Sequence, residues 1–187
     1  MAQLPPIETE RLVLRLPTRD DVPAIVAYYS QNREHLQPWS PTWPQDILTQ
    51  EFWRRDVVRR QAEYSAGLSA AMFLFEKADG QRLVGNLSLT QIVRGAAHYC
   101  MLGYGLAADA QGNGYMLEAV RGAVRFAFGG LRLHRVMAGY VPRNRRSARV
   151  LRRAGFEIEG YARAYLCLNG RWEDHVLTAI TNWDWEG

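Results

Sequence analysis

The segment from Gly103 to Met116 is the part of the sequence best suited to chemistry. An apolar strand leads into a loop that contains Gly112 and Gly114, and a helix is expected directly after the loop. The first turn of a helix has unpaired backbone N–H groups and carries the positive end of the helix dipole, so it attracts anions. Glycine lets a pyrophosphate approach the backbone, and Gly114 is also suited to a backbone angle that other residues avoid. The spacing therefore predicts a phosphate-binding loop.

Two common phosphate-binding motifs are absent from this segment. A Walker loop would continue with Gly-Lys-Ser/Thr, and a dinucleotide-binding turn would have the pattern Gly-x-Gly-x-x-Gly with an acidic residue at the end of a following strand. Neither pattern occurs between Gly103 and Met116. A glycine-containing turn between a strand and a helix is also common where no ligand binds. The loop by itself favours an anion site without identifying the ligand.

The loop resembles the coenzyme A pyrophosphate loop of the GNAT acetyltransferase superfamily, Gln/Arg-x-x-Gly-x-Gly/Ala. Gln111 and Gly114 match this pattern, whereas Met116 stands where Gly or Ala is usual. That departure is typical of the ribosomal-protein acetyltransferase branch, the RimJ/RimL type, where Gln-Gly-x-Gly precedes a bulky pair. The resemblance implies acetyl-CoA as co-substrate, with no metal.

Further segments extend the resemblance over nearly the whole chain. Residues 144–157, with Asn144, Ser147 and Gly155-Phe156, are similar to the family's Asn-x-x-Ser…Gly-Phe helix, which lies along the pantetheine and thiol of coenzyme A. The other similar segments are Glu8–Arg15, Val93–Gly95, Gly160–Tyr161 and Asn169–His175. The resemblance is closest to the RimJ type. It implies transfer of an acetyl group to the N-terminal alanine of a small-subunit ribosomal protein, by direct attack in a ternary complex.

The resemblance also assigns residues to the cofactor. Unpaired backbone groups of one strand would pair with the pantetheine amides where two parallel strands splay apart, and N–H groups of the loop would hold the pyrophosphate. Asn144 is almost as well suited to capping the helix that follows it, and the two roles are compatible. The expected cofactor-binding residues are Tyr104, Gly105, Leu106, Gln111, Gly112, Asn113, Gly114, Tyr115, Met116, Asn144 and Ser147.

Ser147 is the candidate general acid for the departing thiolate, by analogy with the family motif. A serine in the first turn of a helix is equally well explained by local hydrogen bonds. No residue stands out as general base: Glu63 and His98 are conceivable, and a water-mediated base is an alternative. A free α-amine titrates near roughly 8, so a useful neutral fraction exists without strong assistance. No Cys-His or Ser-His pair is evident, which argues against an acyl-enzyme.

Two further groups of side chains are candidates for binding. Six arginines within residues 143–153 suit the 3′-phosphate of coenzyme A or ribosomal RNA, although a solvated helix face explains at least half of them. Four aromatic residues suit an acceptor pocket, with core or loop packing as the alternative, which is preferred for Trp172. The arginines are Arg143, Arg145, Arg146, Arg149, Arg152 and Arg153; the aromatic residues are Trp39, Trp43, Tyr165 and Trp172.

Hydrophobic periodicity and turn signals predict the elements that position these residues. Helices are expected after Asp20-Asp21, from a cap at Asp46 to about Tyr64, over 115–128 before Gly129-Gly130, and from Asn144 to Gly155. Turns are expected at Asp79-Gly80 and Asn169-Gly170. Strands are expected over 11–16, 71–76, 83–91, 98–106, 135–140, 161–168 and 172–180. This order predicts an α+β fold and one domain, 1–187. The resemblance implies a mixed sheet of about seven strands, helices on both faces, and splayed fourth and fifth strands.

Composition is consistent with one globular domain of a cytoplasmic protein. The chain has 187 residues and a net charge of +4, and 22% of its residues are charged. No apolar run approaches the roughly 20 residues of a membrane helix, and no secretory signal is evident. Cys100 and Cys167 match no metal or redox spacing, and both are expected to be reduced and buried. The oligomeric state, monomer or homodimer, stays open.

Two other functions compete with protein acetylation. The same cofactor half would serve a GNAT enzyme for a small amine such as a polyamine, an antibiotic or an amino acid, with only the variable loops changed. The basic helix alternatively suits a ribosome-assembly factor that keeps the fold with vestigial activity and contacts ribosomal RNA.

Overall fold

Strand β3 (Ala70–Glu76) is central to the sheet and is buried along nearly its whole length. Its side chains alternate between two hydrophobic cores, because successive residues of a strand point to opposite faces. Met72 and Leu74 lie in the larger core, and Phe73 and Phe75 lie in the smaller one. Both faces of the sheet are therefore covered, as the continuous apolar sequence of β3 predicts.

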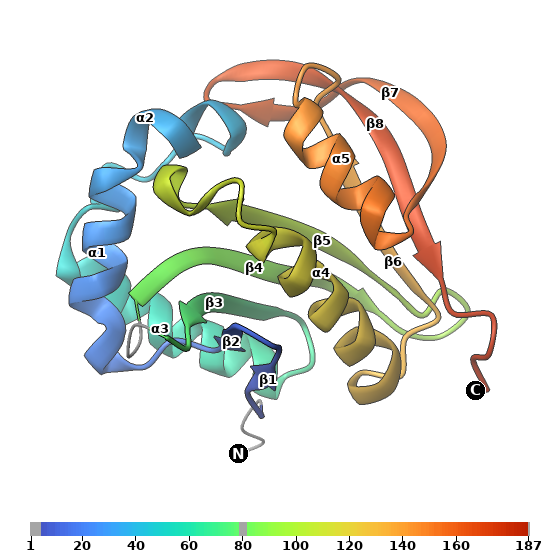
Figure 1. Ribbon diagram of the computed structural model, residues 1–187, viewed down its shortest axis with the longest axis horizontal. Helices are drawn as coiled ribbons and strands as arrows, with labels where there is room; N and C mark the ends of the chain where they lie inside the picture. The colour runs from blue at the N-terminus through green and yellow to red at the C-terminus, as the bar shows by residue number, and fades with distance from the viewer. Residues whose placement is uncertain (1–4, 79–81, 187) are drawn as a thin grey trace.

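The computed structural model describes residues 5–78 and 82–186. Within them, one eight-stranded sheet has the order β1-β2-β3-β4-β5-β6-β8-β7 (Figure 1). Among the strand pairs of the described residues, only β5 and β6 are parallel. The other strands are β1 (Ile7–Glu8), β2 (Leu12–Arg15), β4 (Arg82–Val93), β5 (Tyr99–Leu106), β6 (Arg135–Tyr140), β7 (Glu157–Leu168) and β8 (Arg171–Thr181). The mixed sheet confirms the predicted fold class. The short β1 raises the count above seven, so the expected fourth and fifth strands are β5 and β6.

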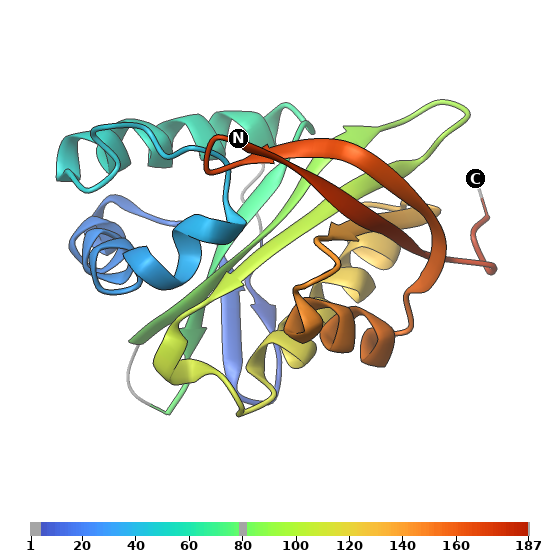
Figure 2. The ribbon, with the colours of Figure 1, turned by 90° about the horizontal axis from the view of Figure 1, so that it is seen from above.

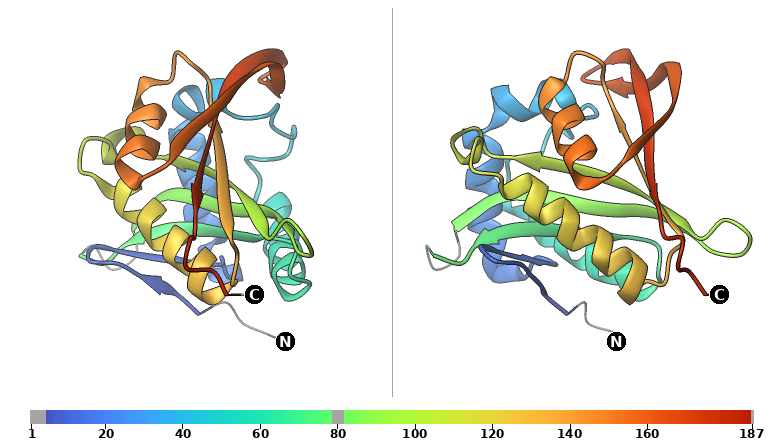
Figure 3. Two further views of the ribbon diagram at one scale, coloured as in Figure 1. Left: turned by 90° about the vertical axis from the view of Figure 1, so that its right-hand side faces the viewer. Right: turned by 45° about the vertical axis from the view of Figure 1, so that its right-hand side comes forward.

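Helices cover both faces of the sheet, as Figure 2 shows from above. On one side, α3 (Gln50–Ser65) packs Trp53 and Val57 against the aromatic residues of β3. On the other side, α4 (Tyr115–Arg125) packs against β1, β2 and β4, and α5 (Arg145–Ala154) lies against α4 and β6 (Figure 3). Helix α1 (Val22–Gln31) leads into the four-residue α2 (Arg33–Leu36). The sequence carries no clear signal for α2.

Strands β5 and β6 separate along their length. They pair only where Tyr99–Met101 meets residues 135–137, although β5 continues to Leu106 and β6 to Tyr140. The far half of β5 therefore keeps its hydrogen bonds to β4 but has none to β6. This separation confirms the splayed pair and leaves an open strand edge inside the protein.

Two local expectations need correction, and a third is not tested. Helix α3 begins at Gln50 and is capped by the Thr49 side chain, because Asp46 lies in the preceding turn and pairs with Arg55. Helix α4 ends at Arg125 and continues as a wider π turn over Phe126–Gly130. The expected turn at Asp79-Gly80 lies outside the described residues.

The two cysteines differ in environment. Cys100 is buried in β5 as predicted, and burial raises the pKa of its thiol to about 12. Cys167 is exposed, so its predicted burial is wrong. Its strand, β7, is the last of the sheet and has only β8 beside it. Among the described residues, no helix is both long and apolar enough to cross a bilayer.

Candidate active site

A continuous cavity of about 930 Å³ includes the open end of β5, the start of α4 and one side of α5 in its lining. Nearly all residues expected to bind the cofactor contribute to this lining, with Asn113 as the exception. The segment 39–44 and parts of α1, α2 and α3 form the remaining walls. The expected residues that line the cavity are Tyr104, Gly105, Leu106, Gln111, Gly112, Gly114, Tyr115, Met116, Asn144 and Ser147.

The loop before α4 presents unpaired N–H groups. Gly112 and Gly114 have left-handed φ angles of +85° and +79°, and a Cβ at Gly112 would meet nothing within 4 Å. The backbone N–H groups of residues 112–114 form no hydrogen bond to any described residue. The Gln111 N–H does donate to the Ala108 carbonyl, over 3.4 Å. Successive free N–H groups at a helix N-terminus are suited to binding an anion such as a diphosphate.

The C-terminal end of this loop is anchored by residues just before β2. The Arg11 guanidinium donates to the Asn113 carbonyl (2.9 Å) and pairs with the Glu118 carboxylate of α4 (2.7 Å). Glu118 also accepts hydrogen bonds from the Thr9 hydroxyl and the Arg11 N–H. Burial raises the pKa of Glu118, but these hydrogen bonds outweigh it, so the pKa is lowered and the side chain stays ionised. The helix start is thus held to the sheet by a charged contact.

The Tyr104 and Ser147 hydroxyls meet across the separated strands. Their oxygens lie 2.8 Å apart, and Tyr104 reaches from β5 to the first turn of α5. Burial raises the pKa of Tyr104 to about 12, so its hydroxyl keeps its proton at neutral pH. The Asn144 side chain accepts from the Ser147 N–H (3.1 Å), which confirms its capping role. Ser147 therefore has a fixed position and a proton-bearing neighbour that the sequence did not indicate.

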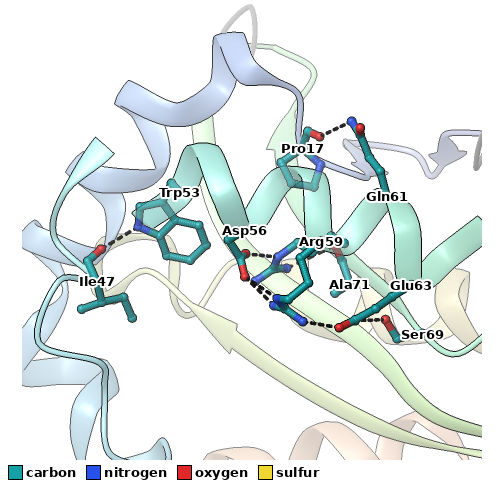
Figure 4. Close-up of polar contacts among 10 residues, drawn as sticks. Pro17, Ile47, Trp53, Asp56, Arg59, Gln61, Glu63, Ser69 and Ala71 are labelled. Carbon is teal, nitrogen blue, oxygen red and sulfur yellow. Dashed lines mark hydrogen bonds and ion pairs between the residues drawn. The ribbon is translucent and has the colours of Figure 1, made fainter. Parts of the chain in front are cut away.

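Helix α3 adds a buried charge network to the cavity wall. Asp56 is only 6% exposed and binds both Arg59 and Arg60 through its carboxylate (Figure 4). Arg60 also donates to the Ala71 carbonyl of β3 (3.2 Å). Both Asp56 oxygens are occupied by arginines, so this carboxylate is not available as a general base.

Glu63 and His98, the two candidate general bases, do not line the cavity. Glu63 accepts hydrogen bonds from Ser69 and Arg59, which outweigh the effect of burial and lower its pKa. His98 packs against Trp185, with 4.7 Å between ring centroids. The structure thus places Glu63 in a surface ion network on α3 and His98 in a contact with the C-terminal segment.

The aromatic candidates divide into two groups. Trp39 and Trp43 line the cavity, whereas Tyr165 and Trp172 do not. Trp172 is 63% exposed, which excludes the core packing considered for it. The Asn169 N–H of the β7–β8 turn donates to the carbonyl of Ser40 (2.8 Å), beside Trp39. The hairpin thereby steadies the 39–44 segment, which is part of the cavity wall.

The arginines of residues 143–153 also divide. Arg146, Arg149 and Arg153 line the cavity. Arg143 instead pairs with Glu173 and lies over the Trp39 ring, 5.3 Å from its centroid. Exposed Arg145 and Arg152 do not line the cavity, as a solvated helix face predicts. The cavity therefore has a cationic side near the helix N-terminus of α4.

Comparison with known proteins agrees with this geometry. The family model for the acetyltransferase (GNAT) domain matches residues 11–157. The [ribosomal protein uS5]-alanine N-acetyltransferase of Escherichia coli is 38% identical over 96% of this chain and 92% of that protein. The ribosomal-protein-S5-alanine acetyltransferase of Vibrio fischeri superposes with a TM-score of 0.92 at 35% identity, covering 98% of this chain and 100% of that one.

Mycobacterium smegmatis RimJ, solved in complex with CoA-disulfide, superposes with a TM-score of 0.87 at 26% identity, over 97% of this chain and 91% of that one. Among the described residues, no group of three or more His, Cys, Asp or Glu side chains is arranged to hold a metal ion. The family match, the close relative and the shared fold lead to one conclusion: the chain is an enzyme of the GNAT family of acetyltransferases.

Proposed function

We propose that this acetyltransferase transfers the acetyl group of acetyl-CoA to the N-terminal alanine amine of a ribosomal protein. The observation that carries the proposal is the pair of free N–H groups of Gly112 and Gly114 before α4, because both residues line the same cavity as the unpaired edge of β5. The relationship to the uS5-alanine N-acetyltransferase of Escherichia coli supports the choice of acceptor. Acetylation of a ribosomal protein would place the reaction in the cytoplasm.

The cavity has features that fit each part of the cofactor. Free N–H groups of residues 112–114 suit the diphosphate, and Arg146, Arg149 and Arg153 suit the phosphate groups by charge. The end of β5 has backbone groups without a β6 partner, which suit the pantetheine amides as a substitute strand. Asn113 is the one proposed cofactor-binding residue that does not line the cavity, and only its backbone N–H would contribute.

The chemistry follows from positioning and one proton donor. The neutral amine attacks the thioester carbon, the C–S bond breaks, and the thiolate takes a proton from the Ser147 hydroxyl. Tyr104 is 2.8 Å from Ser147 and is protonated at neutral pH, so it is able to return that proton. The attacking nitrogen releases its own proton to solvent and Tyr104 regains one from solvent, which balances the reaction. General acid catalysis of this kind contributes roughly 10²–10⁴-fold to rates.

The exposed arginines of α5 support a second contact. Arg145 and Arg152 are exposed and do not line the cavity, so they are available to phosphate groups of ribosomal RNA. If these two arginines neutralise two phosphates, RNA binding weakens as the salt concentration rises. Replacing both residues by alanine should therefore reduce the slope of log K against log salt concentration. An unchanged slope in fluorescence anisotropy with an RNA hairpin would argue against this contact.

The acceptor is tested with purified protein, acetyl-CoA and a panel of amines. A peptide beginning with Ala, taken from the N-terminus of uS5, should gain one acetyl group by mass spectrometry. The same peptide with a blocked N-terminus should gain none, and Ser147→Ala should slow the reaction without abolishing coenzyme A binding. Acetylation of polyamines or amino acids in place of the peptide would support a small-amine enzyme instead.

A further inference from the structure

Two residues at the corner between α1 and α2 contact the cofactor loop. The buried Asn32 side chain accepts a hydrogen bond from the Ala108 N–H over 2.8 Å. One turn later, the His35 Nε2 lies 2.8 Å from the Gln111 amide nitrogen. These contacts join segments 76 residues apart in sequence. They attach the loop to the wall of the cavity opposite α5.

The His35 contact has a defined direction. The amide nitrogen of Gln111 only donates, so Nε2 of His35 accepts and Nδ1 carries the ring proton. The lone pair of Nε2 is therefore engaged, which makes His35 unsuited to act as the missing general base although it lines the cavity. Its contribution is to hold Gln111.

Gln111 stands at the N-terminal end of the loop, where the backbone contacts are long: its N–H donates to the Ala108 carbonyl over 3.4 Å and its carbonyl accepts from the Asn113 side chain over 3.4 Å. It directly precedes Gly112, where a Cβ would find open space, so no side-chain packing restrains the backbone there. The Asn113 carbonyl is tied to Arg11, but that anchor lies beyond Gly112. A contact that orders the binding loop before the ligand arrives lowers the entropic cost of binding.

We propose that His35 is a positioning residue for the cofactor: through Gln111 it holds the N–H groups of residues 112–114 in the geometry that receives the diphosphate. The inference rests on the proposed function, because it presumes that this loop binds acetyl-CoA. His35 belongs to a short helix that the family motif does not include. Helix α2 also leads directly into the cavity wall at Trp39.

The test compares His35→Ala with His35→Gln and with Glu34→Ala, a control at an exposed position on the same helix. Loss of one neutral hydrogen bond corresponds to roughly fivefold weaker binding. His35→Ala should therefore raise the Kd for coenzyme A by calorimetry, and the KM for acetyl-CoA, about fivefold, with kcat little changed. His35→Gln keeps an acceptor and should recover part of the affinity. Glu34→Ala should match the wild type.

A double-mutant cycle separates positioning from a general loss of structure. His35→Ala and Gln111→Ala should weaken binding by less together than the sum of their separate effects, since both remove one contact. Equal coenzyme A affinity of wild type and His35→Ala, or fully additive effects, would overturn the inference. Failure of the wild type to bind coenzyme A would instead overturn the proposed function, so the two failures are distinguishable. Thermal unfolding of each variant identifies any loss of fold.

Discussion

Replacing Gly114 by alanine tests the backbone geometry on which the anion site depends. Gly114 precedes α4 with a φ of +79°, and an added Cβ would lie 3.6 Å from the Arg11 Nη2, an ordinary contact. The cost is therefore conformational rather than steric. A left-handed angle costs an L-residue about 1–2 kcal/mol. The reduced freedom of the unfolded chain offsets about 0.4–1 kcal/mol of that. We expect a net loss of about 1 kcal/mol.

This loss should appear in thermal unfolding followed by circular dichroism, as a melting temperature lower by about 2–4 °C. Gly129→Ala is the matched control, because Gly129 has no positive φ and its Cβ would meet nothing within 4 Å. The control should be neutral or slightly stabilising. Gly114→Asn should lose less than Gly114→Ala, since asparagine tolerates left-handed angles. Wild-type stability for Gly114→Ala, or an equal loss for Gly129→Ala, would refute the reasoning.

Three further predictions follow from buried polar groups. Asp56→Asn leaves Arg60 without its buried carboxylate and should lower the free energy of unfolding, measured with urea, by roughly 3 kcal/mol. Asp46→Asn is the control: it removes the more exposed ion pair with Arg55 and should cost under about 0.5 kcal/mol. The folded pKa of Glu118 lies below its ordinary value of 4.5, so the stability it contributes is present above pH 4.5 and lost as pH falls towards the folded pKa. Glu118→Gln should not show this loss of unfolding free energy when stability is measured from pH 7 down to pH 3. Tyr104→Phe should lower kcat at least roughly tenfold, and wild-type thiol release should show no loss from Tyr104 ionisation below pH 10 because its pKa is about 12.

Local signals in the sequence determined the elements around the site. Asn144 caps α5 and Gly155 ends it with a left-handed φ of +97°, as both residue types predict. Asn169 and Gly170 both have positive φ, the requirement of the tight hairpin turn that their pairing indicates. The predicted cap at Asp46 is wrong for an equally local reason. Thr49, three residues later, is also a capping residue, and its side chain caps α3. Such features depend on a few neighbouring residues, so a single sequence is enough to predict them.

The family motifs in the sequence also indicated which residues line the cavity at the loop before α4. Only the tertiary structure decided what holds them. Tyr104 meets Ser147 across 43 residues and His35 meets Gln111 across 76, and no periodicity relates such positions. These contacts exist because β5 and β6 separate and because α2 lies beside the loop, and both depend on the order of strands in the whole sheet. Strand order is a global property of the packed chain, which is why these partners become visible only in the fold.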